Sequence, residues 1–387
     1  MGKLLKILLR ILVVLVLILV ATGFWQREKI MRLLAVNSLF SAEKIVNNFS
    51  HMDSMFLTTP IDIGQGAASE LPAGPPAPEI DGLENWIKQR SVTALVVLKD
   101  GKIVTERYFQ GTGKDDLRIS WSVAKSYLAN LLGILVAEGK IGSLDDPVVK
   151  FAPQLKGSAY EGATIRNVLN MASGVKFNED YLDFNSDINK MGRIIALGGT
   201  LDDFAAGINE QENPPGTVWQ YVSIDTHVLG MVIRGATGRP IPDLLGEKIL
   251  VPLGLEKSPY YITDGSGVAF VLGGLNMTTR DYARFGLMNM NRGKWNGQQI
   301  VPADWIDAST TPSAPKTGGH TGYGYQWWIP KNAPEGEYMA RGVYGQYIYI
   351  NTALGVVIAS NAADRRFRED GVSEQNIEMF RRIAAAL

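Results

Sequence analysis

The chain of 387 residues contains no cysteine and only three histidines. Without cysteine it can form neither disulfides nor a thiol nucleophile, and three histidines far apart in the sequence argue against a zinc site. An excess of charge of one sign is also missing, because 38 Lys and Arg stand against 39 Asp and Glu. Since nucleic-acid-binding surfaces are strongly basic, this balance argues against a nucleic-acid partner.

The motif Gly-x-Ser-x-Gly is absent as well. In α/β-hydrolases this motif presents the nucleophilic serine on a sharp turn between a strand and a helix. The histidines are poorly placed to act as a general base, because His51 lies near the N-terminus, His227 within a helical pattern and His320 in a Gly-rich loop. The sequence therefore disfavours a Ser-His-Asp enzyme.

The N-terminus carries a long apolar run. Three basic residues, the last of them Arg10, precede the uncharged segment Ile11 to Gln26, a pattern that directs the rest of a chain across a membrane. Ala21-Thr22-Gly23 also fits a signal-cleavage site. We expect either an uncleaved, single-pass membrane anchor or a cleaved signal. Both place the body outside the cytoplasm, tethered to the membrane in the periplasm or secreted.

Composition divides the chain into three parts. Residues 1–26 form the anchor or signal segment, and residues 27–81 form a leader whose end is rich in Pro, Gly and Ala. Such a composition is typical of a semi-extended spacer. A single large domain is expected over residues 82–387, with a mainly helical lobe at about 142–255.

The expected elements define the fold class. Residues 93–109 indicate a β-hairpin on the turn Asp100-Gly101. Helical patterns follow, and strand-like patterns return at 323–329, 345–350 and 355–360 before a last helix at 374–387. Because hairpins link the strands, we predict an α+β fold. Its central antiparallel sheet would combine N- and C-terminal segments and be flanked by helices.

The tetrapeptide Ser122-Val123-Ala124-Lys125 is the strongest chemical signal. Positions i and i+3 share a helix face, so the lysine amine can lie beside the serine hydroxyl. Serine needs such an adjacent proton acceptor to become a nucleophile. A helix N-terminus adds unpaired N–H groups that favour developing negative charge.

Ser-x-x-Lys occurs four times, at Ser41, Ser122, Ser173 and Ser313, although roughly one match is expected by chance. Ser41 lies in the leader, a glycine follows Ser173 at once, and prolines flank Ser313. Only Ser122 precedes a helix-length apolar pattern, at residues 127–141. The spacing therefore selects Ser122 as nucleophile and Lys125 as its base.

A tyrosine is the expected partner of this lysine. Tyr221-Val222-Ser223 lies between a Pro- and Gly-rich turn and a helical pattern that begins near Ile224. Tyr221 would therefore stand where a constrained turn enters a helix, with its phenol free to project into a cleft.

These residues occur in the order found in the penicillin-recognising serine hydrolases. From about Gly82 to Leu387 the chain resembles class C β-lactamases, family VIII-type esterases and, most closely, 6-aminohexanoate-dimer hydrolases. Further matching segments are Leu144-Asp145-Asp146-Pro147, residues 164–174, Asn213-Pro214-Pro215-Gly216 and residues 322–328.

The resemblance implies a β-lactamase/transpeptidase-like fold and a mechanism. Ser122 would be acylated, with Lys125 and Tyr221 relaying its proton to the leaving group before water hydrolyses the acyl-enzyme. The backbone N–H groups of Ser122 and Val343 would hold the oxyanion. No metal or cofactor is implied, the substrate would be a small amide or ester, and the oligomeric state is not specified.

The chain departs from the family pattern at two places. The family's Lys-Thr-Gly motif occurs literally at 316–318, but it precedes the Tyr-Gln-Trp-Trp strand that it should follow. Ala340-Arg341-Gly342 is in the expected place, with Ala340 where lysine is expected, and Ser223 stands where β-lactamases carry asparagine. Both changes argue against β-lactam recognition, whereas acyl transfer is unaffected.

Candidate substrate-binding residues follow from the same resemblance. Ser223 is a candidate in the motif Tyr221-Val222-Ser223, and Gly342 is a candidate in Ala340-Arg341-Gly342. Asp180, Tyr181 and Asp183 belong to an acidic, aromatic loop that lines the cleft in the amide-hydrolase branch, although a solvated loop is the alternative. Trp327 and Trp328 alternate on a strand, so one could face the cleft, and Trp327 is the candidate.

Two rival functions remain. A β-lactamase or D-Ala-D-Ala carboxypeptidase would share the fold. A catalytically silent binding or sensor protein would keep the scaffold without the reaction.

Overall fold

The computed structural model describes residues 2–315 and 322–387. Within them, a seven-stranded antiparallel sheet has the order β3-β2-β13-β12-β11-β10-β9. Its strands are β2 (Val92–Lys99), β3 (Lys102–Tyr108), β9 (Gly322–Tyr323), β10 (Trp328–Ile329), β11 (Glu337–Gly342), β12 (Gln346–Asn351) and β13 (Val356–Ala362). The expected α+β fold, with one sheet built from the two ends of the domain, is confirmed.

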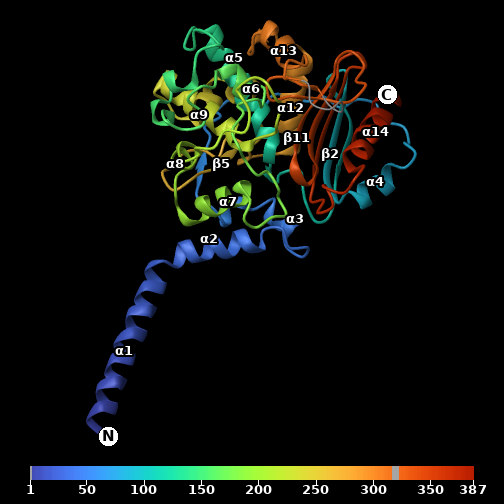
Figure 1. The fold of residues 1–387 in the computed structure, drawn as a ribbon. Helices are drawn as coiled ribbons and strands as arrows, with labels where there is room; N and C mark the ends of the chain where they lie inside the picture. Colours follow the sequence, from blue (N-terminus) through green and yellow to red (C-terminus); the bar gives the residue numbers. More distant parts are fainter. Residues whose placement is uncertain (1, 316–321) are drawn as a thin grey trace.

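Helices cover both faces of this sheet (Figure 1). Helices α4 (Leu83–Gln89) and α14 (Val372–Ala385) pack on one face, and α12 (Thr279–Met290) packs on the other. Side chains along β2 point alternately to the two faces of the sheet. Leu95 and Val97 pack in the core beneath α4 and α14, whereas Val96 and Leu98 pack in the core on the α12 side. Strands buried on both faces therefore carry continuous apolar runs.

The predicted hairpin joins β2 and β3, with Asp100 and Gly101 both at positive φ in its turn. The expected strands at 345–350 and 355–360 pair as β12 and β13. The prediction of a single continuous strand at 323–329 is wrong. Residues 324–327 form a turn between β9 and β10 in which Gln326 has φ 63°, so the strand pattern is interrupted.

The helical lobe lies beside the sheet and is built around α5 (Ala124–Ala137). Its other helices include α6 (Ile165–Leu169), α7 (Asp187–Leu197), α8 (Leu201–Ala206), α9 (Ser223–Thr237) and α10 (Ile241–Leu245). A capping box fixes the start of α6, because the Thr164 side chain accepts from the N–H of Asn167 and the Asn167 side chain accepts from the N–H of Thr164. A small sheet, in the order β1-β5-β6-β4, joins this lobe to the leader. Its strands are β1 (Thr58–Pro60), β4 (Arg118–Ile119), β5 (Tyr260–Ile262) and β6 (Leu275–Met277).

The leader is packed into the body, which a domain boundary at residue 82 did not anticipate. Helix α2 (Arg27–Ser38) lies against α7, where the Arg32 side chain donates to the carbonyl of Ala196. Five apolar leader residues are buried in the main core: Leu39, Ile45, Phe49, Met52 and Ile61. Their irregular spacing gives no helical or strand period, so the sequence pattern did not reveal their burial.

Helix α1 (Gly2–Trp25) extends away from the body and none of its residues is buried (Figure 1). By length and composition it is long and apolar enough to cross a membrane. A signal sequence would have the same properties.

Candidate active site

Ser122 lies at the start of α5, a largely buried helix of the lobe. It belongs to a short 3₁₀ turn, Trp121–Val123, which runs directly into α5. Trp121 has φ 43°, a left-handed conformation that is uncommon outside glycine. This turn leaves the Ser122 side chain partly exposed at the wall of a cleft.

Lys125 lies within the first turn of α5 and is buried, with 1% of its surface exposed. Its Nζ donates to the carbonyl of Leu272 at 2.9 Å and to Ser223 Oγ at 3.4 Å. Burial lowers the pKa of Lys125 to about 7, although the carboxylates of Glu179 and Asp225 oppose this effect. A substantial fraction of the amine is therefore neutral near pH 7 and able to accept a proton.

Tyr221 stands immediately before α9, and its ring stacks on Trp328 with centroids 5.3 Å apart. The Lys125 amine lies 5.5 Å from the centroid of the same ring. Burial raises the pKa of Tyr221, and its side-chain contacts with Ser122 and Ser223 lower it in part. The structure thus brings Ser122, Lys125 and Tyr221 to one site.

Glu179 also reaches this cluster, a residue that the sequence did not single out. Its carboxylate accepts hydrogen bonds from the Ser223 N–H at 2.9 Å, from the Ser223 hydroxyl and from the Tyr181 hydroxyl at 2.6 Å. Nothing in the sequence separates Glu179 from Asp180 and Asp183 in the same acidic loop. Only the docking of that loop on the N-terminus of α9 makes the distinction.

The end of β11, at Gly342, lies close to the backbone of Ser122. A Cβ atom at Gly342 would lie 2.7 Å from the carbonyl oxygen of Ser120 and 3.1 Å from the Ser122 nitrogen, so a side chain there cannot fit. Among the described residues, neither the Ser122 nor the Val343 N–H donates a hydrogen bond to a protein acceptor. Two unpaired donors beside a serine hydroxyl are suited to hold an oxyanion.

The cleft has a volume of about 480 Å³. Its walls include Tyr221, Trp328, Glu179, Asp180 and Tyr181. Two cations, Arg341 and Arg368, also line it; Arg341 lies 5.4 Å from the ring of Trp328, and Arg368 lies 5.7 Å from that of Tyr181. The cleft therefore offers both signs of charge and aromatic surface around Ser122.

Two expected cleft residues do not line it. Trp327 is fully buried in the core, whereas its neighbour Trp328 faces the cleft, because the turn at Gln326 sets which of the two points inward. Asp183 instead holds its own loop together, accepting hydrogen bonds from Asn178 and from the N–H of Asn185.

The position at which the resemblance predicts the family's lysine is closed to the cleft. Ala340 is buried within β11, whereas Arg341, the next residue, faces the cleft. The literal Lys316-Thr317-Gly318 motif lies outside the described residues, as does His320.

The two described histidines lie away from Ser122. His51 is exposed, and buried His227 pairs through Nε2 with Asp202 Oδ1 at 2.7 Å. Over residues 2–315 and 322–387, no group of three or more His, Asp or Glu side chains is arranged to hold a metal ion.

Comparisons with known proteins agree with this geometry. The family model described as Beta-lactamase matches residues 83–375. The 6-aminohexanoate-dimer hydrolase of Paenarthrobacter ureafaciens is 28% identical over 296 residues, which cover 73% of this chain and 75% of that protein. A D-aminopeptidase of Cereibacter sphaeroides is 26% identical over 190 residues, covering 46% of this chain and 34% of that protein.

A solved Bacillus anthracis structure, provisionally named as a 6-aminohexanoate-dimer hydrolase, superposes with a TM-score of 0.78 at 23% identity. The match covers 89% of this chain and 95% of that chain. At this identity the likeness concerns the fold.

Proposed function

The chain belongs to the beta-lactamase family and is a serine hydrolase, and on this basis we propose that it forms an acyl-enzyme at Ser122 and hydrolyses small amides or esters. One observation carries the proposal: Ser122, Tyr221 and the backbone of Gly342 border one cleft although they are distant in sequence. The Lys125 amine lies beside them, 5.5 Å from the Tyr221 ring.

In the proposed acylation step, Ser122 Oγ attacks the carbonyl carbon of the substrate. The neutral Lys125 amine, with a pKa of about 7, accepts the hydroxyl proton, and Tyr221 passes a proton to the leaving amine or alcohol as its bond to the carbonyl breaks. The N–H groups of Ser122 and Val343 would stabilise the oxyanion. Loss of one such donor costs about 3 kcal/mol in well-studied hydrolases.

Deacylation would reverse these roles. Water attacks the ester carbonyl of the acyl-enzyme, its proton passes to the Tyr221–Lys125 pair, and Ser122 Oγ leaves with a proton from the same pair. The open cleft of about 480 Å³ gives water access to this carbonyl.

A fluorophosphonate probe tests the nucleophile. We expect the purified wild-type protein to be labelled, with the added mass on the peptide that contains Ser122, and Ser122→Ala to remain unlabelled while keeping the wild-type unfolding temperature. A folded wild-type protein that takes no label would contradict the enzyme proposal and favour a silent scaffold.

A substrate panel separates the enzyme from its rival within the fold. Hydrolysis of p-nitrophenyl esters or short ω-amino-acid amides, with no turnover of a chromogenic cephalosporin, supports the amidase or esterase proposal. Buried Ala340 in place of the family's lysine supports this outcome, because the cation expected to bind a β-lactam carboxylate is missing at that position.

We also propose that α1 exports the body and tethers it to the membrane. The basic residues before the apolar run favour an N-terminus in the cytoplasm. Membrane fractionation with measurement of the mature mass tests this. An uncleaved chain in the membrane fraction supports the anchor, and a soluble chain shortened near Ala21-Thr22-Gly23 supports a signal.

A further inference from the structure

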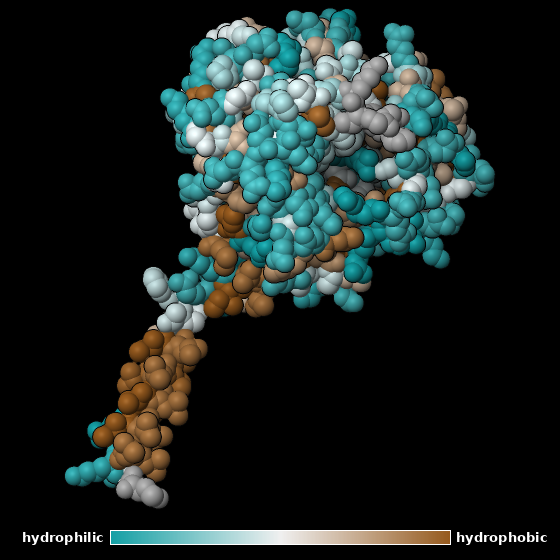
Figure 2. Space-filling view, in the orientation of Figure 1, coloured by the Kyte–Doolittle hydropathy of each residue, from teal (hydrophilic) through white to brown (hydrophobic). Residues whose placement is uncertain are grey.

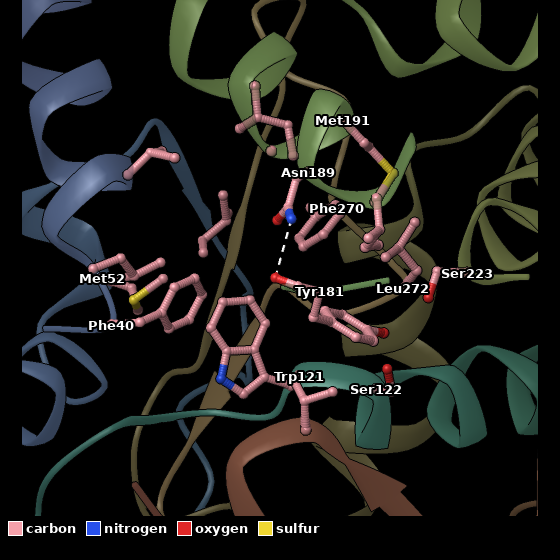
Figure 3. Close-up of a pocket in the computed structure, with 18 of the residues that line it drawn as sticks. Phe40, Met52, Trp121, Ser122, Tyr181, Asn189, Met191, Ser223, Phe270 and Leu272 are labelled. Atoms are coloured by element: carbon pink, nitrogen blue, oxygen red, sulfur yellow. Dashed lines mark hydrogen bonds between the residues drawn. The ribbon is translucent and has the colours of Figure 1, made fainter. Parts of the chain in front are cut away.

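Ser122 borders two cavities. Besides the cleft, it lines a second, apolar cavity of about 110 Å³ (Figure 3). One water requires roughly 10–15 Å³ of such volume, so this cavity has room for an aliphatic chain of medium length. Ser122 and Ser223 lie on one side of it in Figure 3, and Phe40 and Met52 lie on the opposite side.

The cavity wall is almost entirely apolar. Trp121, Phe270, Leu272 and residues of the leader and of α7 surround it. Its polar side chains are largely paired already: Ser223 and Tyr181 donate to Glu179, and Asn189 donates to the carbonyl of Tyr181. Among the described residues, the Trp121 indole N–H is buried without a partner. A polar ligand would find few partners here, whereas an aliphatic chain would bury its surface at no polar cost.

The leader supplies the side of the cavity that faces away from the serine. Val36 of α2, with Leu39, Phe40 and Met52, lines it together with Ile188 and Met191 of α7. Helix α2 crosses below α7 at the end of the body from which α1 departs (Figure 1). The cavity thus lies between the nucleophile and the end of the body that bears the apolar helix.

Apolar side chains are exposed on the outside of this same end. Ile30, Met31 and Leu34 are exposed on α2, while Leu182 and Phe184, 80% and 64% exposed, lie in the loop before α7. Figure 2 shows this apolar surface where α1 joins the body. Exposed apolar residues on a helix that also carries Arg27 and Lys29 are typical of a surface that rests on a lipid bilayer.

We propose that the apolar cavity binds the aliphatic acyl chain of an ester or amide that resides in the membrane. The proposal rests on the proposed acyl-enzyme function, which it deepens by naming the substrate class. The acyl chain occupies the cavity, its carbonyl carbon lies at Ser122, and the leaving group departs through the open cleft. The exposed residues of α2 and of the loop before α7 hold the body against the bilayer from which the substrate enters.

A series of p-nitrophenyl esters from acetate to dodecanoate tests the cavity in the full chain. Each methylene buried contributes roughly fourfold, so we expect kcat/KM to rise at least tenfold from acetate to octanoate. Gly192 shares the inward face of α7 with Ile188 and Ile195, and a Cβ there meets open space, so Gly192→Leu would fill the cavity without a clash.

We expect Gly192→Leu to lower the octanoate-to-acetate ratio of kcat/KM at least tenfold. Gly113→Leu, which also meets open space but lies outside this cavity, should keep the wild-type ratio. A flat series in the wild type, or a ratio unchanged by Gly192→Leu, overturns the acyl-chain site while Ser122 labelling and acetate hydrolysis persist. Loss of labelling in the wild type would overturn the proposed function itself.

Delivery from the membrane has a separate readout. With p-nitrophenyl dodecanoate in phosphatidylcholine vesicles, the double variant Leu182→Gln/Phe184→Gln should hydrolyse at least fivefold more slowly than the wild type. Its rate on soluble acetate should not change, because neither residue lines a cavity at Ser122. Equal rates on the vesicles would overturn the membrane source of the substrate.

Discussion

Glu179 accepts hydrogen bonds from both the backbone N–H and the hydroxyl of Ser223, 44 residues further along the chain. The same hydroxyl receives a hydrogen bond from Lys125 at 3.4 Å. A carboxylate is therefore fixed at the N-terminus of α9, close enough to raise the pKa of the Lys125 amine against the effect of burial. This relationship connects the acidic loop with the proton acceptor of the proposed mechanism.

The first prediction concerns the pH dependence of catalysis. Because only the neutral amine accepts a proton, kcat/KM should rise with pH through about 7, the pKa of Lys125. Glu179→Gln removes a negative charge that favours the ammonium, so the midpoint of this rise should move to lower pH. Asp180→Asn, in the same loop, is the control and should leave the midpoint in place. A midpoint that Glu179→Gln leaves unchanged or raises would contradict the coupling.

The second prediction concerns the oxyanion site. In Gly342→Ala the new Cβ would meet Ser120 and Ser122, so the end of β11 must move and separate the two N–H donors. We expect kcat for a short ester to fall about 10²-fold, as for the loss of one oxyanion donor. Gly113→Ala serves as the control, since a Cβ there meets open space. Wild-type turnover in Gly342→Ala would exclude this site.

A third prediction concerns the leader. Removal of residues 1–26 should leave the free energy of unfolding unchanged, because α1 buries no residue. Removal of residues 1–56 should lower the free energy of unfolding by several kcal/mol, since each large apolar side chain lost from a core costs about 1.5–3 kcal/mol. Leu39, Ile45, Phe49 and Met52 would all be lost. Urea denaturation measures both, and equal stability of the two truncated proteins would show that the leader is dispensable.

The last prediction concerns Asp225, which is buried beneath the site. Burial raises the pKa of this carboxyl from 3.8 to about 7, although hydrogen bonds from Tyr160 and Ser173 oppose the shift. The folded state therefore holds this proton at pH values where the unfolded chain has lost it, so the contribution to stability declines as pH rises from about 4 through 7.

Asp225→Asn removes that proton equilibrium. Its free energy of unfolding, measured with urea, should fall less between pH 4 and pH 7 than that of the wild type. Parallel pH dependence in the two proteins would mean that Asp225 does not titrate in this range. Asp180→Asn, at an exposed carboxyl, should follow the wild type.

Sequence alone predicted the elements whose signals are local. The Asp100-Gly101 turn, the helix that follows Ser122 and the paired strands β12 and β13 were all predicted, because turn chemistry and apolar period act over a few residues. The serine and its lysine could be paired for the same reason, since one turn of helix separates them.

Tertiary structure decided the contacts that join distant segments. Sequence analysis passed over Glu179 and favoured Trp327 over Trp328, because the correct choice depends on how a loop or turn docks on another element. The burial of the leader beside Ser122 was also hidden, since its apolar residues follow no period. Residue type and spacing thus identified the proposed nucleophile and its proposed base, whereas packing between segments determined what surrounds them.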